Sequence, residues 1–548
     1  MAKIESPNRT TSLLVKSKEG PMSLPGHWWS ASQSYVSEIL SLLAAAPDRD
    51  VVHWRGEAFS GGDLIRSVTE TFLALRNRGV GKGDVVAILV APNSPEMLTV
   101  RYATHLLGGA VCYLRTTNPG TRATVLPLDH QIQILRDTEA VTVYTDAEGS
   151  ERATEIADGS GIPVTRLRHG ERNEVGRVDA ADTPDAVSWD PDALAFIGFT
   201  SGSTGRPKGI RLSGRAWEAT MRAWMEVGRE YDCASILVST PLSHGVAAMA
   251  DAVFALGGAL YLHESFDAEK FVDTVSAEKE VSWTFMATNH VFQVIDHLLE
   301  RGIRDSEAVA AAGLSSLKRI VYGGSPAAPA RIAQAFRLFG PILAQGYATS
   351  ESGRVAILTP QEHGDPELAA TVGRPFPEVE VVVCNSNSGA QLAAGEIGEV
   401  RVRSPQMMDG YNGNSELTAQ VLRDGWYFTG DIGRLDERGY LTLLGRVAHV
   451  IKVGGVKVHP IVLEAEILSH PGVRHAAVYG VQDEDGSDHI HAAIECDPAE
   501  VVDVENVRAR IAEALSPIHV PEKIHVLSAL PMNGNGKPDK VLLKLRYS

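Results

Sequence analysis

The sequence predicts a layered α/β fold, because short apolar runs alternate with helical patterns through most of the chain. Residues 85–90, VVAILV, have no polar face, which is typical of a strand covered on both sides in a parallel sheet. The residues that follow, 97–107, have a helical pattern. The runs at 235–239, 260–262 and 319–322 repeat this order, with helix-like stretches between them. We therefore expect parallel strands covered by helices.

A change of pattern near residue 379 predicts two further units. Short strand-like runs at 379–383, 398–403 and 440–444 are typical of antiparallel strands and indicate a barrel-like or meander subdomain. After Arg446, a small α+β unit of about a hundred residues is expected. Its predicted elements, in chain order, are strand 448–453, helix 460–469, strands 476–479 and 490–495, helix 504–515 and strand 523–527.

Length and charge favour a multidomain globular protein that does not bind nucleic acid. At 548 residues the chain exceeds the size of one compact core, so two or more domains are expected. Its formal net charge of −17 argues against duplex recognition, which depends on basic surface. One local cationic pocket for a nucleotide is compatible with that charge.

Targeting and cysteine patterns favour a cytoplasmic protein. No stretch approaches the roughly twenty apolar residues of a membrane helix, and residues 1–21 lack the apolar core of a secretory signal. The four cysteines are scattered, without metal-ligand or disulfide spacing. We expect buried thiols in a reducing compartment, at Cys112, Cys233, Cys384 and Cys496.

The most informative segment is 199–209, FTSGSTGRPKG, which follows the apolar run 193–198. Glycines let backbone N–H groups approach phosphate oxygens closely, and hydroxyls add hydrogen-bond donors. Lys208 supplies a compact positive charge. The segment is therefore predicted to bind a polyanion, although a plain Gly/Ser surface loop is the alternative. The common triphosphatase motif is absent, because Lys208 precedes Gly209 rather than serine or threonine.

Five further motifs follow in order. They are GGSP at 323–326, QGYATSE at 345–351, WYFTGD at 426–431 with Gly445-Arg446, IKVGGVKV at 451–458 and NGNGK at 533–537. In this order and spacing the chain resembles the adenylate-forming superfamily of acyl-CoA synthetases, peptide-synthetase adenylation domains and beetle luciferases, from about Ile39 to the C-terminus. A chain that ends soon after the last motif, with no carrier or condensation domain, favours the free-standing acyl-CoA ligase type.

The resemblance implies a particular architecture. A large N-terminal domain, residues 1–446, would contain two mixed sheets with helices and a distorted β-barrel at about 379–445. A hinge at 447–449 would connect it to a small, mobile α+β domain at 450–548. The active site would lie between the two domains.

The resemblance also implies a reaction in two halves. A carboxylate would attack the α-phosphate of ATP to give acyl-AMP and pyrophosphate, and a thiol would then displace AMP to give a thioester. The implied cofactors are ATP/AMP, Mg²⁺ and coenzyme A, and the partner is a small carboxylic acid.

Site roles transfer to this chain by matching position in the motifs. The phosphates would be held by Thr200, Ser201, Gly202, Ser203, Thr204, Gly205 and Lys208. Glu351, with Thr204, would hold Mg²⁺. Tyr347 would lie against adenine, with Gly323 and Gly324 on its other side. Asp431 would bind the ribose, and Arg446 would act at the ribose or phosphate. The same motifs contribute Ser325 and Ala348 to the nucleotide site, and Ser350, whose hydroxyl would approach phosphate or metal. The implied thiol-side residues are Lys452, Gly454 and Gly455. Lys537 would bridge the substrate carboxylate and the α-phosphate, and His244 would lie at the edge of the acyl pocket.

The chain departs from the family pattern at three places. Ala348 stands where glycine usually faces the substrate carboxylate, and Ala448 stands where the hinge usually carries aspartate or lysine. The family often has proline near residues 288–290, where this chain has none; Asn289 is expected to cap the following helix instead. These changes indicate a specialised member, in which adenylation could be weak and transfer to the thiol the main activity.

Other functions stay open at this stage. The thiol could belong to coenzyme A or to a carrier protein, and a regulatory nucleotide-binding protein is the alternative outside enzymes. Residues 235–249 contain no aspartate to pair with an amino group, so a carboxylic acid without an amino group is favoured. The size and shape of the acyl group are not encoded in any motif.

Overall fold

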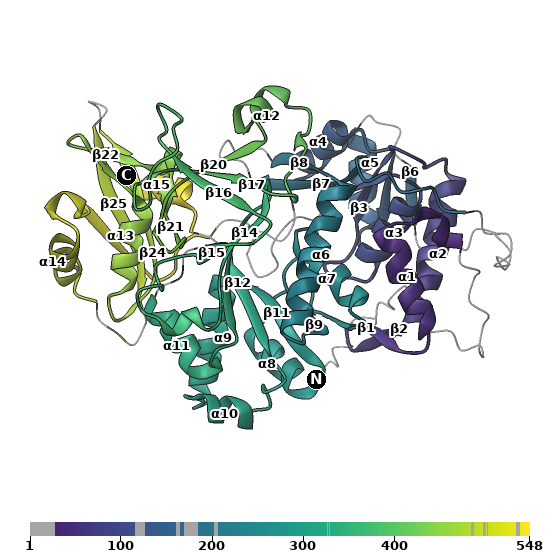
Figure 1. Ribbon diagram of the computed structural model, residues 1–548, viewed down its shortest axis with the longest axis horizontal. Helices are drawn as coiled ribbons and strands as arrows, with labels where there is room; N and C mark the ends of the chain where they lie inside the picture. The colour runs from purple at the N-terminus through teal and green to yellow at the C-terminus, as the bar shows by residue number, and fades with distance from the viewer. Residues whose placement is uncertain are drawn as a thin grey trace, which may run out of the picture.

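The computed structural model describes the chain from residue 28 onward, with several short gaps. The described residues are 28–114, 126–160, 165–168, 185–201, 207–325, 327, 329–483, 487–496, 500, 502–532 and 538–547. Figure 1 shows the two large sheets with their helices on the right and below, and the C-terminal elements on the left.

The first sheet has nine strands, in the order β15-β14-β13-β12-β11-β9-β10-β1-β2. The six neighbouring strands β13, β12, β11, β9, β10 and β1 pair in parallel. At the edges, β2, β14 and β15 pair antiparallel with their neighbours. The bounds are β1 Asp50–Trp54, β2 Glu57–Ser60, β9 Ser235–Val238, β10 Leu260–Leu262, β11 Val281–Ala287, β12 Arg319–Gly323, β13 Leu343–Thr349, β14 Gly353–Leu358 and β15 Arg374–Pro375.

The second sheet has seven strands, in the order β18-β8-β7-β4-β3-β5-β6. It is also mixed, because β8 pairs antiparallel with both β7 and β18, whereas the other pairs are parallel. The bounds are β3 Val85–Leu89, β4 Ala110–Tyr113, β5 Thr142–Thr145, β6 Thr165–Arg168, β7 Leu194–Ser201, β8 Pro207–Ser213 and β18 Gly410–Tyr411.

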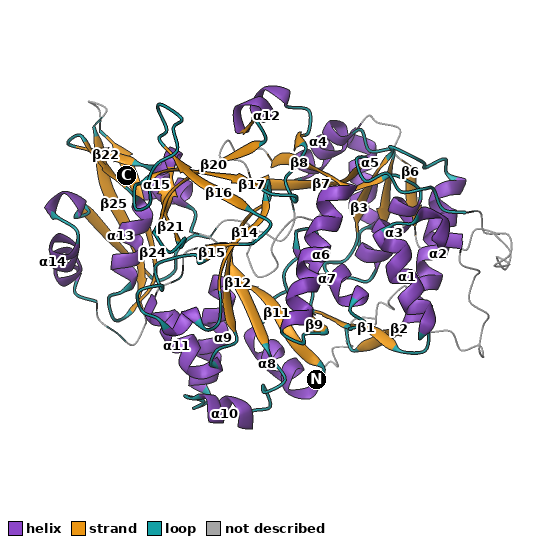
Figure 2. Cartoon of the chain, in the orientation of Figure 1, coloured by secondary structure: helices purple, strands orange, loops and turns teal. Residues whose placement is uncertain are grey.

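A helical layer separates and covers these sheets (Figure 2). The largest core cluster joins α1, α2, α3, α6 and α7 with strands of both sheets, so the two sheets share one apolar core. Helices α8, α9 and α11 pack on the other side of the first sheet. The bounds are η1 Trp28–Ser32, α1 Tyr35–Ala45, α2 Gly61–Asn77, α3 Glu96–Leu106, α4 Leu128–Thr138, α5 Ser150–Ser160, α6 Gly214–Glu230, α7 Val246–Ala255, α8 Ala268–Ala277, α9 Thr288–Glu300, α10 Ser306–Ala311, α11 Pro329–Phe339 and η3 Glu362–Gly364.

The predicted barrel-like part contains a five-stranded antiparallel sheet, and smaller sheets follow it. Its elements are β16 Glu380–Cys384, β17 Gly398–Arg403, α12 Ser415–Val421, β19 Leu422–Arg423, β20 Trp426–Leu435 and β21 Leu441–Arg446. The C-terminal elements are η4 Val447–His449, β22 Ile451–Val453, β23 Val456–Val458, α13 Pro460–Leu468, β24 Val473–Gln482, β25 Asp488–Cys496, α14 Val504–Ala514, η5 Pro517–His519, β26 Lys523–Leu527 and α15 Lys540–Tyr547. The predicted α/β class with two mixed sheets and a small α+β unit is confirmed.

Two local predictions are wrong. The strand expected at 448–453 begins only at Ile451, because residues 447–449 form a 3₁₀ turn and β22 pairs with β23 in a separate hairpin. Asn289 does not cap α9. Strand β11 runs directly into that helix, so Ala287 occupies the cap position and no side chain caps it.

Candidate active site

The first part of the site is a tyrosine–aspartate–arginine group. Tyr347, on β13, donates a hydrogen bond from its hydroxyl to Asp431 Oδ2 at 2.5 Å. Arg446, at the end of β21, donates from Nε to Asp431 Oδ1 at 3.0 Å. Asp431 is 7% exposed, and its strand β20 pairs with β21 so that Asp431 faces Arg446 in the ladder. Each oxygen of the Asp431 carboxylate therefore accepts one hydrogen bond, which fixes the orientation of the group.

The backbone next to Tyr347 requires glycine. Gly323, at the end of β12, pairs with Gly346, and a Cβ on Gly323 would lie 2.4 Å from the Gly346 carbonyl oxygen. Gly324 has a φ of +88°, a conformation that favours glycine. Thr288 Oγ1 donates hydrogen bonds to the carbonyls of Gly323, at 3.3 Å, and Ser325, at 3.0 Å. These contacts fix the turn at Gly323 and Gly324 beside the strand that carries Tyr347.

The second part of the site surrounds Glu351. The hydroxyl of Tyr411 donates a hydrogen bond to Glu351 Oε1 at 2.9 Å. Lys208 Nζ lies 5.7 Å from the centroid of the same tyrosine ring. The turn that presents Glu351 is fixed by Thr349, whose Oγ1 accepts a hydrogen bond from the backbone N–H of Ser352 at 3.0 Å. The structure therefore places Lys208 and Glu351 beside the same tyrosine.

Tyr427, on β20, connects the two parts. Burial raises its pKa, and the negative charges of Glu351 and Asp431 add to the effect, so the phenol stays protonated. Burial likewise raises the pKa of Tyr411, with Glu351 adding to it, and the pKa of Tyr347, with Asp431 adding to it. All three phenols therefore stay protonated near these carboxylates.

The phosphate-binding segment is described only at its edges. Strands β7 and β8 form a hairpin in which Thr200 pairs with Lys208, and Ser201 with Pro207. The loop between them, with Gly202, Ser203, Thr204 and Gly205, lies outside the described residues. The hairpin places the beginning and end of this loop beside each other and near Glu351.

Lys537 also lies outside the described residues, but its flanks are described. A bridge between Met532 and Pro538 holds the ends of its loop together. Burial lowers the pKa of His449, and the positive charges of Lys540 and Arg446 lower it further. Lys540, shortly after Lys537, forms an ion pair with Glu464 at 2.6 Å.

The remaining predicted residues fall into two groups. Lys452, Gly454 and Gly455 are exposed on the β22–β23 hairpin, where the neighbour of Gly454 is Ile518 and a Cβ on Gly455 would have nothing within 4 Å. This hairpin packs within the C-terminal part rather than against Asp431 or Glu351. His244 is half-buried in the turn between β9 and α7. Ala348 and Ser350 are exposed, with an irregularity in the ladder between Tyr347 and Ala348.

The donor set fits Mg²⁺ held mainly by substrate. Among the residues that the structure describes, no group of three or more His, Cys, Asp or Glu side chains could enclose a metal. Mg²⁺ bound by one carboxylate together with nucleotide phosphates needs no such cage. Glu351 is a hard oxygen ligand of the kind that would supply this carboxylate.

Sequence reasoning missed Tyr411, Tyr427 and Thr288 as parts of the site. Tyr427 lay inside the WYFTGD motif but received no role, and Thr288 was noted only for the absent proline. Tyr411 follows a single glycine in an otherwise unremarkable stretch. Only the pairing of β18 with β8 brings it to the site.

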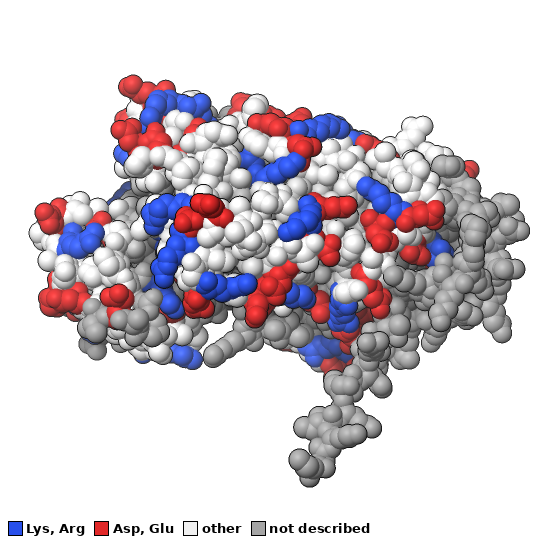
Figure 3. Space-filling model, turned by 90° about the horizontal axis from the view of Figure 1, so that it is seen from below, with Lys and Arg blue, Asp and Glu red and all other residues white. Residues whose placement is uncertain are grey.

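On the face that Figure 3 shows, acidic and basic side chains are interspersed, and neither sign of charge forms a large patch. Within the described part of the chain, no helix has the length and apolar character that crossing a membrane requires.

Comparison with known proteins places this site in a family. Residues 42–412 match the profile of the AMP-binding enzymes, and residues 462–537 match the profile of the AMP-binding enzyme C-terminal domain. The chain belongs to the AMP-binding enzyme family, which confirms the resemblance to the adenylate-forming superfamily. Its class is that of the ATP-dependent, AMP-forming acid–thiol ligases.

Similar proteins act on different acids. A medium/long-chain-fatty-acid–CoA ligase of Mycobacterium tuberculosis is 27% identical, over 93% of this chain and 89% of its own. A feruloyl-CoA synthase of an Amycolatopsis species is 30% identical, over 92% of this chain and 96% of its own. The solved structure of the amide bond synthetase McbA from Marinactinospora thermotolerans matches with a TM-score of 0.81 and 30% identity, over 93% of this chain and 98% of that one.

Proposed function

We propose that the protein activates a carboxylic acid without an amino group as its acyl adenylate and transfers the acyl group to the thiol of coenzyme A. The observation that carries this proposal is that two oriented carboxylates belong to one site. Asp431 accepts hydrogen bonds from Tyr347 and Arg446. Glu351 accepts a hydrogen bond from Tyr411, whose ring lies near Lys208. The CoA ligases among its relatives support the choice of thiol.

In the first half, a carboxylate oxygen attacks the α-phosphorus of ATP, and pyrophosphate leaves. Bringing the two anions together costs about 4 kcal/mol per pair of unit charges at 4 Å and an effective dielectric of 20. Lys208 would offset this repulsion at the β- and γ-phosphates, and Lys537 at the substrate carboxylate and α-phosphate. Asp431 would bind the ribose, and Tyr347 would lie against adenine.

Mg²⁺, bound with the triphosphate, would supply charge neutralisation and orientation of the phosphates. Glu351 would hold it, with Thr204 as the second predicted ligand. Tyr411 holds one carboxylate oxygen, so Glu351 has a defined direction before nucleotide binds.

In the second half, the thiol sulfur attacks the acyl carbon, AMP leaves, and the thiol proton is released. Lys452, Gly454 and Gly455 lie away from Asp431, so they would reach the site only after the C-terminal part turns. We propose that the domains are 1–446 and 450–548, with the turn at 447–449 as the hinge. The 3₁₀ segment η4 between β21 and β22 supports this position.

The structure adds a reason to favour acids without an amino group. Asp251, on α7, is the aspartate next to the stretch 235–249, and it is fully buried. It forms an ion pair with Arg101, with N–O distances of 2.6 and 2.8 Å. A carboxylate committed to this pair does not serve a substrate ammonium group.

Two alternative activities are tested in the same experiment. The similarity to an amide bond synthetase makes an amine a possible acceptor in place of the thiol. The alanines at 348 and 448 make a protein that uses only preformed adenylates the other alternative, since small displacements of the reacting carboxylate are costly.

The test is product detection by mass spectrometry with a panel of fatty, aromatic and polycyclic acids. One arm contains acid, ATP, Mg²⁺ and either CoA or an amine; the second contains the acyl adenylate and CoA. We expect acyl-CoA in both arms for at least one acid. Amide without thioester would contradict the choice of acceptor, and thioester only from the adenylate would contradict complete ligase activity. A Lys537→Ala variant should form no product from acid and ATP, but it should still form acyl-CoA from the acyl adenylate.

A further inference from the structure

We propose that residues 408–412, here called the strap, position Glu351 relative to the phosphate-binding hairpin, with Tyr411 as the positioning residue. The inference rests on the proposed function, because it concerns the nucleotide phosphates and their metal. The strap is attached to both sides of the phosphate end of the site. Neither the sequence motifs nor the relatives' names assign it a role.

One side of the strap is bound to β8, the strand that returns from the phosphate loop. Tyr411 pairs with Ile210 and Gly410 with Arg211 in an antiparallel ladder. The N–H of Asn412 donates to the carbonyl of Gly209 at 2.7 Å. These bonds begin next to Lys208, so the strap is in register with the lysine that would meet the phosphates.

The other side of the strap is bound to Glu351 twice. The N–H of Met408 donates to the backbone carbonyl of Glu351 at 2.8 Å. The hydroxyl of Tyr411 donates to the side-chain oxygen Oε1 at 2.9 Å. Backbone and carboxylate are therefore both tied to the same five-residue segment, and the carboxylate keeps a second oxygen for a metal.

The strap itself is held rigid from outside. Tyr411 N–H donates to Thr418 Oγ1 at 2.9 Å, at the first turn of α12. Gly410 has a φ of +145°, and a Cβ there would lie 2.7 Å from Thr418 Cγ2. Tyr411 is 8% exposed, and its ring packs in a small apolar cluster with Ile210. A rigid support of this kind is what fixes the direction of a metal ligand.

The arrangement has a specific consequence. The strap transmits the position of the phosphate hairpin to Glu351, so a nucleotide that lacks the β- and γ-phosphates does not use it. Loss of the Tyr411 hydroxyl should weaken Mg²⁺-dependent binding of ATP and leave AMP binding unchanged. A purely structural role for Tyr411 would weaken both.

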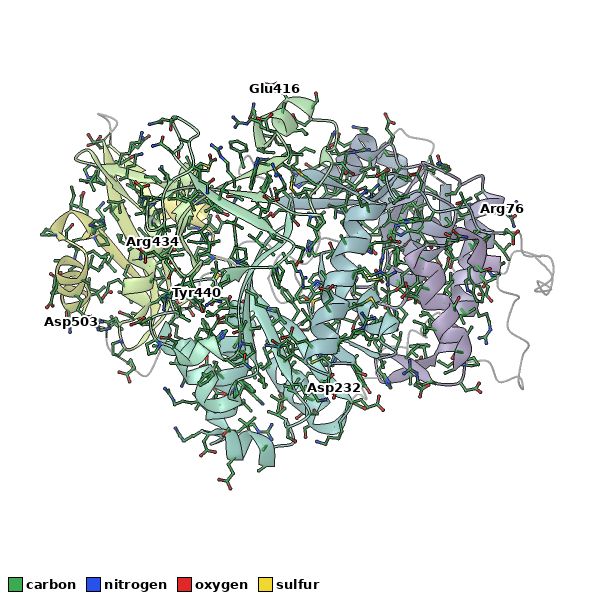
Figure 4. The ribbon with its side chains drawn as sticks, viewed as in Figure 1. Arg76, Asp232, Glu416, Arg434, Tyr440 and Asp503 are labelled. Carbon is green, nitrogen blue, oxygen red and sulfur yellow. The ribbon has the colours of Figure 1, made fainter. Side chains whose placement is uncertain are left out.

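The experiment uses the full chain with Tyr411→Phe. The matched control is Tyr440→Phe, because the Tyr440 hydroxyl donates a similar bond to Glu362 Oε1 at 2.6 Å. Figure 4 labels Tyr440 and, separately at the top of the molecule, Glu416 on α12 beside the strap. Calorimetry measures the affinity for ATP with and without Mg²⁺ and the affinity for AMP.

We expect Tyr411→Phe to lower the Mg²⁺-dependent part of ATP affinity by about 10-fold, the low end for loss of a partner that orients a metal ligand. Affinity for AMP, and conversion of acyl adenylate to thioester, should equal those of wild type. Tyr440→Phe should change none of these. In a double-mutant cycle with Glu351→Gln, the two losses should not add.

Two results would overturn the proposal. An unchanged Mg²⁺ dependence in Tyr411→Phe would remove the role of the hydroxyl, and an equal loss of AMP and ATP affinity would make Tyr411 a folding residue only. The binding measurements do not depend on product formation. If the wild-type protein binds MgATP but makes no acyl-CoA, the proposed function fails and the strap is still tested.

Discussion

Two arginines of the α/β part are both buried, yet their hydrogen-bond partners differ. Arg101, on α3, is 0% exposed and donates to Asp251 and Tyr35. Arg319, the first residue of β12, is 1% exposed, and no described residue accepts a hydrogen bond from any of its three nitrogens. The comparison shows two ways of burying the same charge.

Arg101 belongs to a network with few unmet bonds. Asp251 accepts from Arg101, from the Tyr102 hydroxyl at 2.6 Å and from Trp217 Nε1 at 2.9 Å. The Tyr35 hydroxyl accepts from Arg101 at 2.9 Å and lies 2.8 Å from His105 Nδ1. The network joins α1, α3, α6 and α7 in the layer between the sheets. Such a network specifies how these helices pack.

Arg319 is held by a ring instead. Its guanidinium carbon lies 3.2 Å from the centroid of Tyr231, and burial lowers its pKa. Glu230 is the charged neighbour that raises this pKa, whereas Lys318 and Asp232 pair with each other at the surface. Figure 4 labels Asp232 low in the view, far from Glu416. The cation–π contact replaces only part of the lost hydration.

The largest effect is expected from Arg101→Leu. Removing the arginine leaves Asp251 as an uncompensated buried charge, which costs about 3–5 kcal/mol of the free energy of unfolding. The measurement is the shift of the urea unfolding midpoint, followed by tryptophan fluorescence. The control is Arg222→Leu, which breaks a half-exposed pair with Glu38 between α6 and α1 and should cost less than about 1 kcal/mol. Equal losses in the two variants would contradict the comparison.

Sequence patterns predicted the strands of the core and named candidate residues for the site, but they predicted neither arginine. The apolar runs that became β3, β7, β9 and β12 are local signals, and so are the glycines and hydroxyls of 199–209. The bond between Arg101 and Asp251 spans 150 residues of sequence. A pairing of that range depends on how helices pack, which no local period encodes.

The same reason explains what was missed at the site. Glu351, Asp431 and Arg446 each lie in a motif, so their roles could be predicted and the structure brings Asp431 and Arg446 together. Tyr411 is 60 residues from Glu351 and reaches it only because β18 adds to β8. The strand was predicted to begin at residue 448 because Val450 and Ile451 are β-formers, whereas residues 447–449 form a turn before the hairpin.

The second-largest effect is expected in the pH dependence of the free energy of unfolding. His105 Nε2 lies 2.9 Å from the Ala195 carbonyl and must donate to it, so Nδ1 accepts the Tyr35 proton. Burial, followed by the Arg101 charge, lowers the pKa of His105 to about 3. Because the unfolded chain binds this proton below about pH 6.5, the stability that His105 contributes is complete above that pH. It falls by about 1.4 kcal/mol per pH unit below it, down to the folded pKa.

The measurement compares wild type with His105→Gln between pH 7 and pH 5. Wild type should lose about 2 kcal/mol more than the variant over this range. His263 and His290 are also buried with pKa values lowered to about 4, and they titrate equally in both proteins. The difference between the two curves therefore isolates His105, and parallel curves would contradict the lowered pKa of His105.

The smallest effect on the free energy of unfolding is expected at Arg319, the buried arginine without a hydrogen-bond acceptor among the described residues. Arg319→Met keeps an unbranched stem of similar size against Tyr231 and removes a cation that no described group hydrogen-bonds. Replacing an unsupported buried charge by an apolar side chain is often neutral or stabilising. We expect the urea midpoint to stay or rise, with AMP affinity unchanged, because Gly323 lies at the other end of β12. A loss of unfolding free energy as large as that of Arg101→Leu would contradict the comparison. It would indicate that an anion or ordered water accepts hydrogen bonds from Arg319, so that both arginines are stabilised by hydrogen bonds.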